Sequence, residues 1–248
     1  MRTYTQLYYE FINWKNKVNN VNRYYTQTPL LDLLWDNKDR LEYRIPQGEH
    51  FFRGRIFNLD DIVSTNKEYI NWVDAKESIF QGYDKKDSGA PPRKSASEGR
   101  LNGKGISFLY TCKSKRTVIF ELRPTKNEKI SIAEFSTKSS LVFADLTIFK
   151  SNRIENQRFS DLLRLIAEEF STPHYAGHNY SFTQYLAGQF MDMGFDGIVF
   201  ASSLDPDGEN YVFFNPKNCE AINSRLFIVD NISIEYSPIL RADFQHFD

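Results

Sequence analysis

The chain has 248 residues, with 31 Lys and Arg against 32 Asp and Glu, so its formal net charge is −1. Its composition, 41% hydrophobic and 25% charged, is that of a folded globular protein and excludes wholesale disorder. So neutral a chain is a poor candidate for a protein that works mainly by neutralising nucleic-acid phosphates. The length fits one large domain, or one domain with an extension.

Cysteine content and hydropathy favour a cytoplasmic protein that does not contact a membrane. The only cysteines, Cys112 and Cys219, cannot form a disulfide framework or a cysteine-based zinc site, and so low a count is typical of a reducing cytosol. The N-terminal segment has Glu10 and several Asn where a signal peptide needs an apolar run. The longest uncharged stretch, residues 170–191, is too polar to span a bilayer.

The first part of the chain is predicted to be helical. Apolar residues recur at helical spacing from Tyr4 to Val21, and a second short helix is expected over residues 30–40. No chemistry-bearing motif lies in this part. We therefore expect an N-terminal helical extension over residues 1–45, followed by the main domain over residues 46–248.

The main domain is expected to begin with a short strand at residues 51–56. A long, poorly periodic region follows at residues 60–98, and its second half is rich in Pro, Gly, Ser and charge. This composition predicts a surface loop inserted into the domain, with one helix around residues 67–80.

The remaining chain alternates clusters of strands with helices. Strands are expected at residues 106–110, 117–123, 129–135, 141–145, 197–202, 211–214 and 226–229. One helix is expected at residues 160–170, and another begins at Ser181 with a capping box and ends at Gly194. Regular βαβ alternation is absent, so the sequence predicts an α+β fold of mixed small sheets with flanking helices.

Standard catalytic and metal-binding motifs do not account for the chain. Residues 99–104 resemble a phosphate-binding loop, but their spacing is one residue short and Gly105 stands where Ser or Thr would bind Mg²⁺. His174 and His178 are four residues apart, but Pro173 precedes them and no carboxylate is spaced to join them. We therefore expect no metal site.

A series of short segments is more informative when taken together. Arg53 lies in F-F-R-G-R, Arg100 in G-R-L-N-G-K-G, Tyr110 in L-Y and Glu121 in E-L-R-P. The segments G-F-D-G-I, S-S and N-Y-V-F-F follow, at residues 194–198, 202–203 and 210–214.

In this order the segments resemble the RES-domain family, which is named for an Arg, a Glu and a Ser. The resemblance covers roughly residues 50–220. It implies a fold like that of ADP-ribosyltransferases and an enzyme that cleaves the nicotinamide–ribose bond of NAD⁺ by hydrolysis or phosphorolysis. NAD⁺ would be a substrate, phosphate a co-substrate in the second reaction, and no resident cofactor is expected.

The family is best known as the toxin half of bacterial toxin–antitoxin pairs. The resemblance therefore implies a toxin that depletes cellular NAD⁺ and is held inactive by an antitoxin with a helix-turn-helix DNA-binding part. No direct contact of this chain with nucleic acid is expected, and its oligomeric state stays open. Two alternatives also stay open: transfer of ADP-ribose to a protein target, and a non-catalytic interaction domain on the same fold.

The resemblance places the family's functional residues on Arg53, Arg100, Tyr110, Glu121 and Ser202, with Arg55 as the alternative to Arg53 and Asn210 as a further candidate. Glu121, Arg53 and Ser202 are expected to be catalytic; the residues expected to bind the nucleotide are Arg100, Tyr110, Arg55 and Asn210. One carboxylate suits this chemistry, because nicotinamide leaves as a neutral ring and the oxocarbenium-like ribosyl cation needs electrostatic stabilisation.

The other residue types also suit NAD⁺. The planar guanidinium of arginine makes bidentate bonds to a pyrophosphate, and Tyr110 can stack on the cationic nicotinamide. Strand alternation puts Arg53 and Arg55 on one side, so the sequence does not separate them. Ser203 is likewise adjacent to Ser202 and is not excluded.

Overall fold

The computed structural model describes residues 4–22, 27–58, 82–150, 154–172 and 179–234. The predicted helix at residues 67–80 and the pair His174 and His178 lie outside the described residues. In the part of the chain that is described, no helix is both long and apolar enough to cross a membrane.

The N-terminal helices are confirmed. Helix α1 (Tyr4–Asn20) buries an apolar face formed by residues 7, 11, 14 and 18. Helix α2 (Pro29–Asp36) follows, and the 3₁₀ turn η1 (Lys38–Leu41) leads into the sheet. Thr28 caps α2, because its hydroxyl accepts a hydrogen bond from the Leu31 N–H. Both helices pack on α5, and α1 also contacts α6, so this segment shares the core of the main domain.

The strands form one eight-stranded sheet in the order β1-β5-β6-β7-β3-β2-β4-β8. Among the described strands, β5 and β6 are parallel neighbours and the other pairs are antiparallel. The strands are β1 (Glu42–Ile45), β2 (His50–Ile56), β3 (Leu109–Cys112), β4 (Lys129–Thr137), β5 (Leu141–Asp145), β6 (Gly197–Ala201), β7 (Glu209–Phe213) and β8 (Cys219–Ile228). The α+β class is confirmed, although a single sheet replaces the several small sheets expected.

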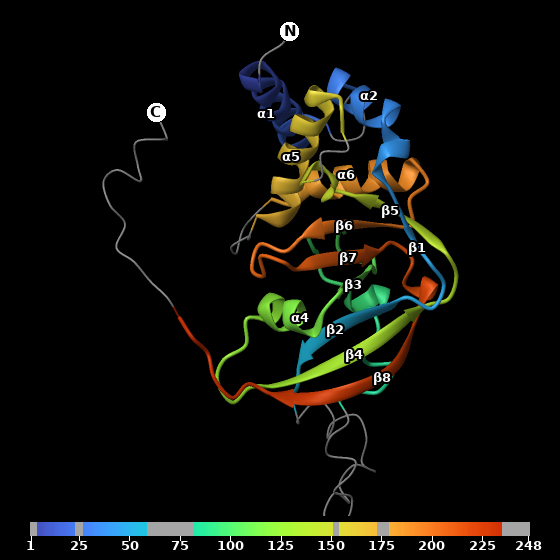
Figure 1. The fold of residues 1–248 in the computed structure, drawn as a ribbon, viewed down its shortest axis with the longest axis vertical. Helices are drawn as coiled ribbons and strands as arrows, with labels where there is room; N and C mark the ends of the chain where they lie inside the picture. The colour runs from blue at the N-terminus through green and yellow to red at the C-terminus, as the bar shows by residue number, and fades with distance from the viewer. Residues whose placement is uncertain (1–3, 23–26, 59–81, 151–153, 173–178, 235–248) are drawn as a thin grey trace, which may run out of the picture.

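Helices cover the sheet in two places. Helices α5 (Gln157–Ser171) and α6 (Ser181–Asp192) lie with α1 and α2 at the β5–β6 end, whereas α4 (Lys115–Leu122) lies apart, beside β2 and β3 (Figure 1). Gly194 has a φ of +92° just after α6, as expected of the glycine that ends a helix. The 3₁₀ turns are η5 (Arg93–Ser95), η6 (Ile148–Lys150) and η7 (Pro216–Asn218).

The expected strand at residues 117–123 is wrong, since these residues belong to α4 and to the turn that ends it. The Ser114 hydroxyl accepts from the Thr117 N–H and caps the helix, and Arg123 ends it with a φ of +48°. The β-branched and aromatic residues of this segment favoured a strand, but a helix buries Val118 and packs Leu122 beside it against β2, β3 and β4. Tertiary packing overrides the local preference here.

The core lies on both faces of the sheet. Helices α1, α2, α5 and α6 share one hydrophobic cluster with Ala144, Ile198 and Val212 of the central strands. A second cluster joins β2 to β5, β6 and β7 across the other face, where the rings of Phe51 and Phe213 are 5.2 Å apart between centroids. Helix α4 packs separately from these two clusters, against β2, β3 and β4.

Candidate active site

A cavity of about 450 Å³ lies between α4, strands β2 and β3, and the turn at residues 97–102. Its volume falls in the range of small-molecule and cofactor sites, roughly 300–1,000 Å³. Five of the seven residues singled out in the sequence line it: Arg53, Arg100, Tyr110, Glu121 and Asn210. These residues come from five different elements, so only the fold brings them together.

The carboxylate of Glu121 is fixed at the wall of this cavity by two side chains. Its Oε1 accepts a hydrogen bond from the Ser202 hydroxyl at 2.7 Å and another from Asn210 Nδ2 at 2.7 Å. Both bonds fall on Oε1, and no described residue donates to Oε2. One oxygen is therefore anchored while the other is available to a ligand.

Ser202 lies just after β6 and is buried, with 7% of its surface exposed. Its oxygen accepts the backbone N–H groups of Leu204 and Asp205, both at 3.1 Å, so its hydrogen is directed to Glu121. Ser203, the adjacent alternative, is exposed. The structure thereby separates two serines that the sequence could not.

Asn210 is oriented by a residue that the sequence analysis did not select. The Cys112 thiol donates to Asn210 Oδ1 at 3.2 Å, which fixes the amide so that Nδ2 faces Glu121. Burial raises the pKa of the Cys112 thiol to about 12, so it stays a neutral donor. No sequence signal could have identified Cys112, because its role depends on the pairing of β3 with β7, where it lies opposite Asn210.

Arg100 binds the C-terminal end of α5. Its guanidinium donates to the carbonyl oxygens of Phe170 and Thr172, and it lies 5.7 Å from the centre of the Phe200 ring. A cation is favoured where a helix exposes its last carbonyls. Burial lowers the pKa of Arg100, and the negative charge of Glu121 opposes that shift. Arg100 therefore brings a fixed positive charge to the cavity.

Arg53 and Arg55 are also separated by the structure. Arg53 lines the cavity and donates from Nη1 to the carbonyls of Ser88 and Gly89, both at 2.7 Å. Burial and the neighbouring Arg55 lower the pKa of Arg53 to about 10, so it remains charged at neutral pH. Arg55 lies outside the cavity lining, exposed, over the Tyr83 ring.

Tyr110 contributes its ring to the cavity wall and its hydroxyl to the neighbouring turn. The hydroxyl donates to Asn102 Oδ1 at 2.6 Å and accepts from the Leu101 N–H at 3.1 Å. Burial raises the pKa of this phenol, so it stays protonated. Because its polar end is occupied by the turn, what Tyr110 offers a ligand is its aromatic ring.

Asn102 organises the turn that presents Arg100. Its Nδ2 lies within hydrogen-bonding distance of three backbone carbonyls, those of Ser97, Gly103 and Ile106. Helix α6 holds the same turn, since the Thr183 hydroxyl donates to the Arg100 carbonyl at 2.6 Å. Asn102 is part of the G-R-L-N segment and could have been selected from it.

Among the described residues, no group of three His, Cys, Asp or Glu could hold a metal ion.

Comparison with models of protein families identifies the family of the chain. The model of the RES domain matches residues 75–233, which is more than half of the chain, and the chain belongs to the RES-domain family. None of the curated proteins matches the chain. Among solved structures, one chain of the M. tuberculosis MbcT–MbcA toxin–antitoxin complex is similar, with 13% identity and a TM-score of 0.46. The similarity covers 80% of this chain and 94% of that chain.

Proposed function

We propose that the protein cleaves the nicotinamide–ribose bond of NAD⁺ and passes ADP-ribose to water or phosphate. The observation that supports this most is the Glu121 carboxylate, held by Ser202 and Asn210 through one oxygen and open at the other. A fixed anion beside the anomeric carbon stabilises a ribosyl cation, or grips a ribose hydroxyl, without needing to reorganise during the reaction.

The charges around the cavity suit the rest of the nucleotide. Arg53 and Arg100 supply two half-buried cations, and each guanidinium has five N–H donors, so the bonds to protein carbonyls leave others for a pyrophosphate. The Tyr110 ring offers a face to the cationic nicotinamide. When the C–N bond breaks, its electron pair returns to the pyridinium ring, so nicotinamide leaves neutral and needs no proton from the enzyme.

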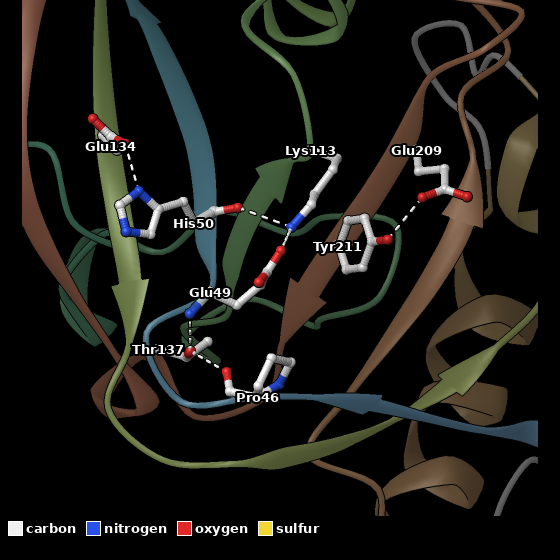
Figure 2. Close-up of polar contacts among 8 residues, drawn as sticks. All are labelled: Pro46, Glu49, His50, Lys113, Glu134, Thr137, Glu209 and Tyr211. Carbon is white, nitrogen blue, oxygen red and sulfur yellow. Dashed lines mark hydrogen bonds and ion pairs between the residues drawn. The ribbon is translucent and has the colours of Figure 1, made fainter.

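The direct test is nicotinamide release from NAD⁺ by the purified protein, with and without phosphate. Glu121→Gln keeps the shape of the side chain but removes its charge, and we expect a loss of at least about a hundredfold in kcat. Glu134→Gln is a matched control. Glu134 also accepts bonds from two side chains, His50 at 2.7 Å (Figure 2) and Asn223 at 2.8 Å, but it lies outside the cavity lining. Full activity of Glu121→Gln would refute the proposal.

Product analysis identifies the acceptor. ADP-ribose indicates hydrolysis, its 1-phosphate indicates phosphorolysis, and label from NAD⁺ retained on a macromolecule in a lysate would instead support ADP-ribosyl transfer. A phosphate-dependent rate with no labelled protein is the pattern expected of a phosphorylase.

We further propose that the protein acts in the bacterial cytoplasm as a toxin, restrained by an antitoxin that has a helix-turn-helix part. Membership of the RES-domain family supports this proposal. Expression without a partner should lower cellular NAD⁺ and stop growth, and Glu121→Gln should abolish both effects. Toxicity that persists in Glu121→Gln, at an unchanged NAD⁺ level, would favour the non-catalytic alternative.

A further inference from the structure

A second connection joins α4 to the loop after β6, one helical turn away from the Glu121–Ser202 bond. The Thr117 hydroxyl donates to Asp205 Oδ2 at 2.8 Å. Both residues are buried, with exposed fractions of 1% and 2%. Neither residue lines the cavity, so this contact does not bind a ligand there.

The two connections form a closed ring. Glu121 binds the Ser202 hydroxyl, whose oxygen accepts the Asp205 N–H, and the Asp205 carboxylate accepts from Thr117. Thr117 precedes Glu121 by four residues on α4, so both side chains lie on the same face of the helix. A helix held by a single side chain can still rotate about that contact, whereas two contacts one turn apart fix its rotation and its distance from the loop.

The surroundings of Thr117 give its hydroxyl one direction. The hydroxyl oxygen of Ser114, the N-cap of α4, lies 2.8 Å from the hydroxyl oxygen of Thr117. Since the Thr117 hydroxyl donates to Asp205, it accepts from Ser114. A Cβ on Gly208 would lie 2.7 Å from Thr117 Cγ2 and 2.8 Å from Asp205 Cβ, so the loop packs against the pair with no spare room. Arg116 lies 3.4 Å from the other Asp205 oxygen on the solvent side.

We propose that Thr117 and Asp205 form a positioning pair for Glu121, which holds α4 so that the free carboxylate oxygen faces the reacting sugar. This inference rests on the proposed NAD⁺ cleavage. A displacement of the carboxylate by about 1 Å would weaken stabilisation of the transition state far more than binding of the substrate, because binding depends on the arginines and Tyr110 as well.

The test is the kinetics of Thr117→Val, which keeps the shape of the side chain and removes the hydroxyl. We expect kcat to fall by about tenfold to a hundredfold, with KM for NAD⁺ changed by less than about threefold. Thr117→Ser restores the hydroxyl and should recover most of the kcat. Asp205→Asn replaces a charged acceptor by a neutral one, so a smaller loss of about threefold is expected.

Thr137→Val is the matched control. Thr137 is also a buried threonine, 3% exposed, and its hydroxyl donates to the Pro46 carbonyl at 2.7 Å and accepts from the Glu49 N–H at 2.9 Å (Figure 2). It lies at the end of β4, away from the cavity lining. This variant should lose a similar amount of stability and retain its kcat.

The outcomes separate the inference from the proposed function. If the wild type turns NAD⁺ over and Thr117→Val has an unchanged kcat, the proposed positioning pair is wrong. If Thr117→Val does not fold, an unchanged kcat in Asp205→Asn contradicts the positioning pair in the same way. Absence of turnover by the wild type overturns the proposed function instead. In that case amide hydrogen exchange decides the positioning pair: exchange at residues 118–122 must rise in Asp205→Asn and stay unchanged in Thr137→Val, and equal protection in both variants overturns the inference.

Discussion

The hydroxyl of Ser202 donates to Glu121 Oε1 at 2.7 Å, although the two residues are 81 positions apart in the chain. One comes from the loop after β6 and the other from the last turn of α4. The bond does two things at once: it satisfies a buried hydroxyl, and it selects which oxygen of the carboxylate remains for a ligand. Proposed chemistry and local stability are therefore coupled at this contact.

Removal of the Ser202 hydroxyl should therefore lower both the turnover and the stability of the protein. Ser202→Ala leaves Glu121 with Asn210 as its remaining described donor, and also leaves the N–H groups of Leu204 and Asp205 without their acceptor. We expect kcat for NAD⁺ cleavage to fall by about tenfold or more, and the free energy of unfolding to fall by about 1–3 kcal/mol. Nicotinamide release and urea unfolding measure the two effects. Ser203→Ala, at the exposed neighbour, should change neither by a comparable amount.

Gly54 tests the fit between β2 and α4. An added Cβ would contact Val118 Cγ1 and lie 2.7 Å from Leu122 Cδ1, both on the helix that holds Glu121. Gly54→Ala should push α4 outward, cost about 1–3 kcal/mol of stability and reduce turnover. Gly188, inside α6, has no atom within 4 Å of an added Cβ. Gly188→Ala should therefore raise the free energy of unfolding by up to about 1 kcal/mol. If Gly54→Ala and Gly188→Ala changed turnover equally, the predicted fit between β2 and α4 would be contradicted.

Glu134 should contribute to stability in a pH-dependent way. The hydrogen bond from His50 (Figure 2), and then that from Asn223, hold the pKa of Glu134 below its usual range. A lowered pKa means that the contribution is present above the ordinary carboxyl pKa and is lost as the pH falls through the folded value. Glu134→Gln should therefore lower stability at pH 7, by less than about 1 kcal/mol for so exposed a pair. Urea unfolding measures the effect: the difference in free energy of unfolding between Glu134→Gln and the wild type should become smaller below about pH 4.

The two cysteines should be unreactive in the folded protein. Burial raises the pKa of Cys112 and of Cys219 to about 12. Alkylation by iodoacetamide at pH 8 should be slow, and its rate should keep rising about tenfold per pH unit beyond the ordinary thiol pKa. Because the folded state favours the neutral thiols, their contribution to the free energy of unfolding is fully present below the ordinary thiol pKa. It is lost as the pH rises towards 12. Fast alkylation at pH 8 without denaturant would contradict the burial, whereas the protein in urea should react fully.

Several elements whose signals are local were predicted well, although the capping box expected at Ser181 is wrong, since Tyr180 is the N-cap of α6 and makes no side-chain capping bond. Strand β5 has the expected bounds, and Gly194 ends α6 as its backbone freedom suggested. The helices of the first 41 residues also followed from apolar spacing. These features depend on residues within a few positions of one another, and sequence neighbours suffice to specify them.

Helix α4 shows where local signals fail. Thr117, Val118, Ile119 and Phe120 favour a strand by their side chains, yet they form the helix that carries Glu121. The decision comes from β2 and β3, against which this helix buries its apolar face, and from the Ser114 cap. Glu121 therefore reaches the cavity from a helix and not from the strand expected at residues 117–123.

The sequence by itself determined the family, the α+β class and most of the residue types of the candidate site, because each of these depends on short segments in a fixed order. Only the tertiary structure decided that Arg53 rather than Arg55 lines the cavity and that Ser202 rather than Ser203 binds Glu121. It alone placed Cys112 behind Asn210 and Thr117 on Asp205. The contacts of Ser202 with Glu121, of Cys112 with Asn210 and of Thr117 with Asp205 join residues between 81 and 98 positions apart, where strand pairing and helix packing set the contact.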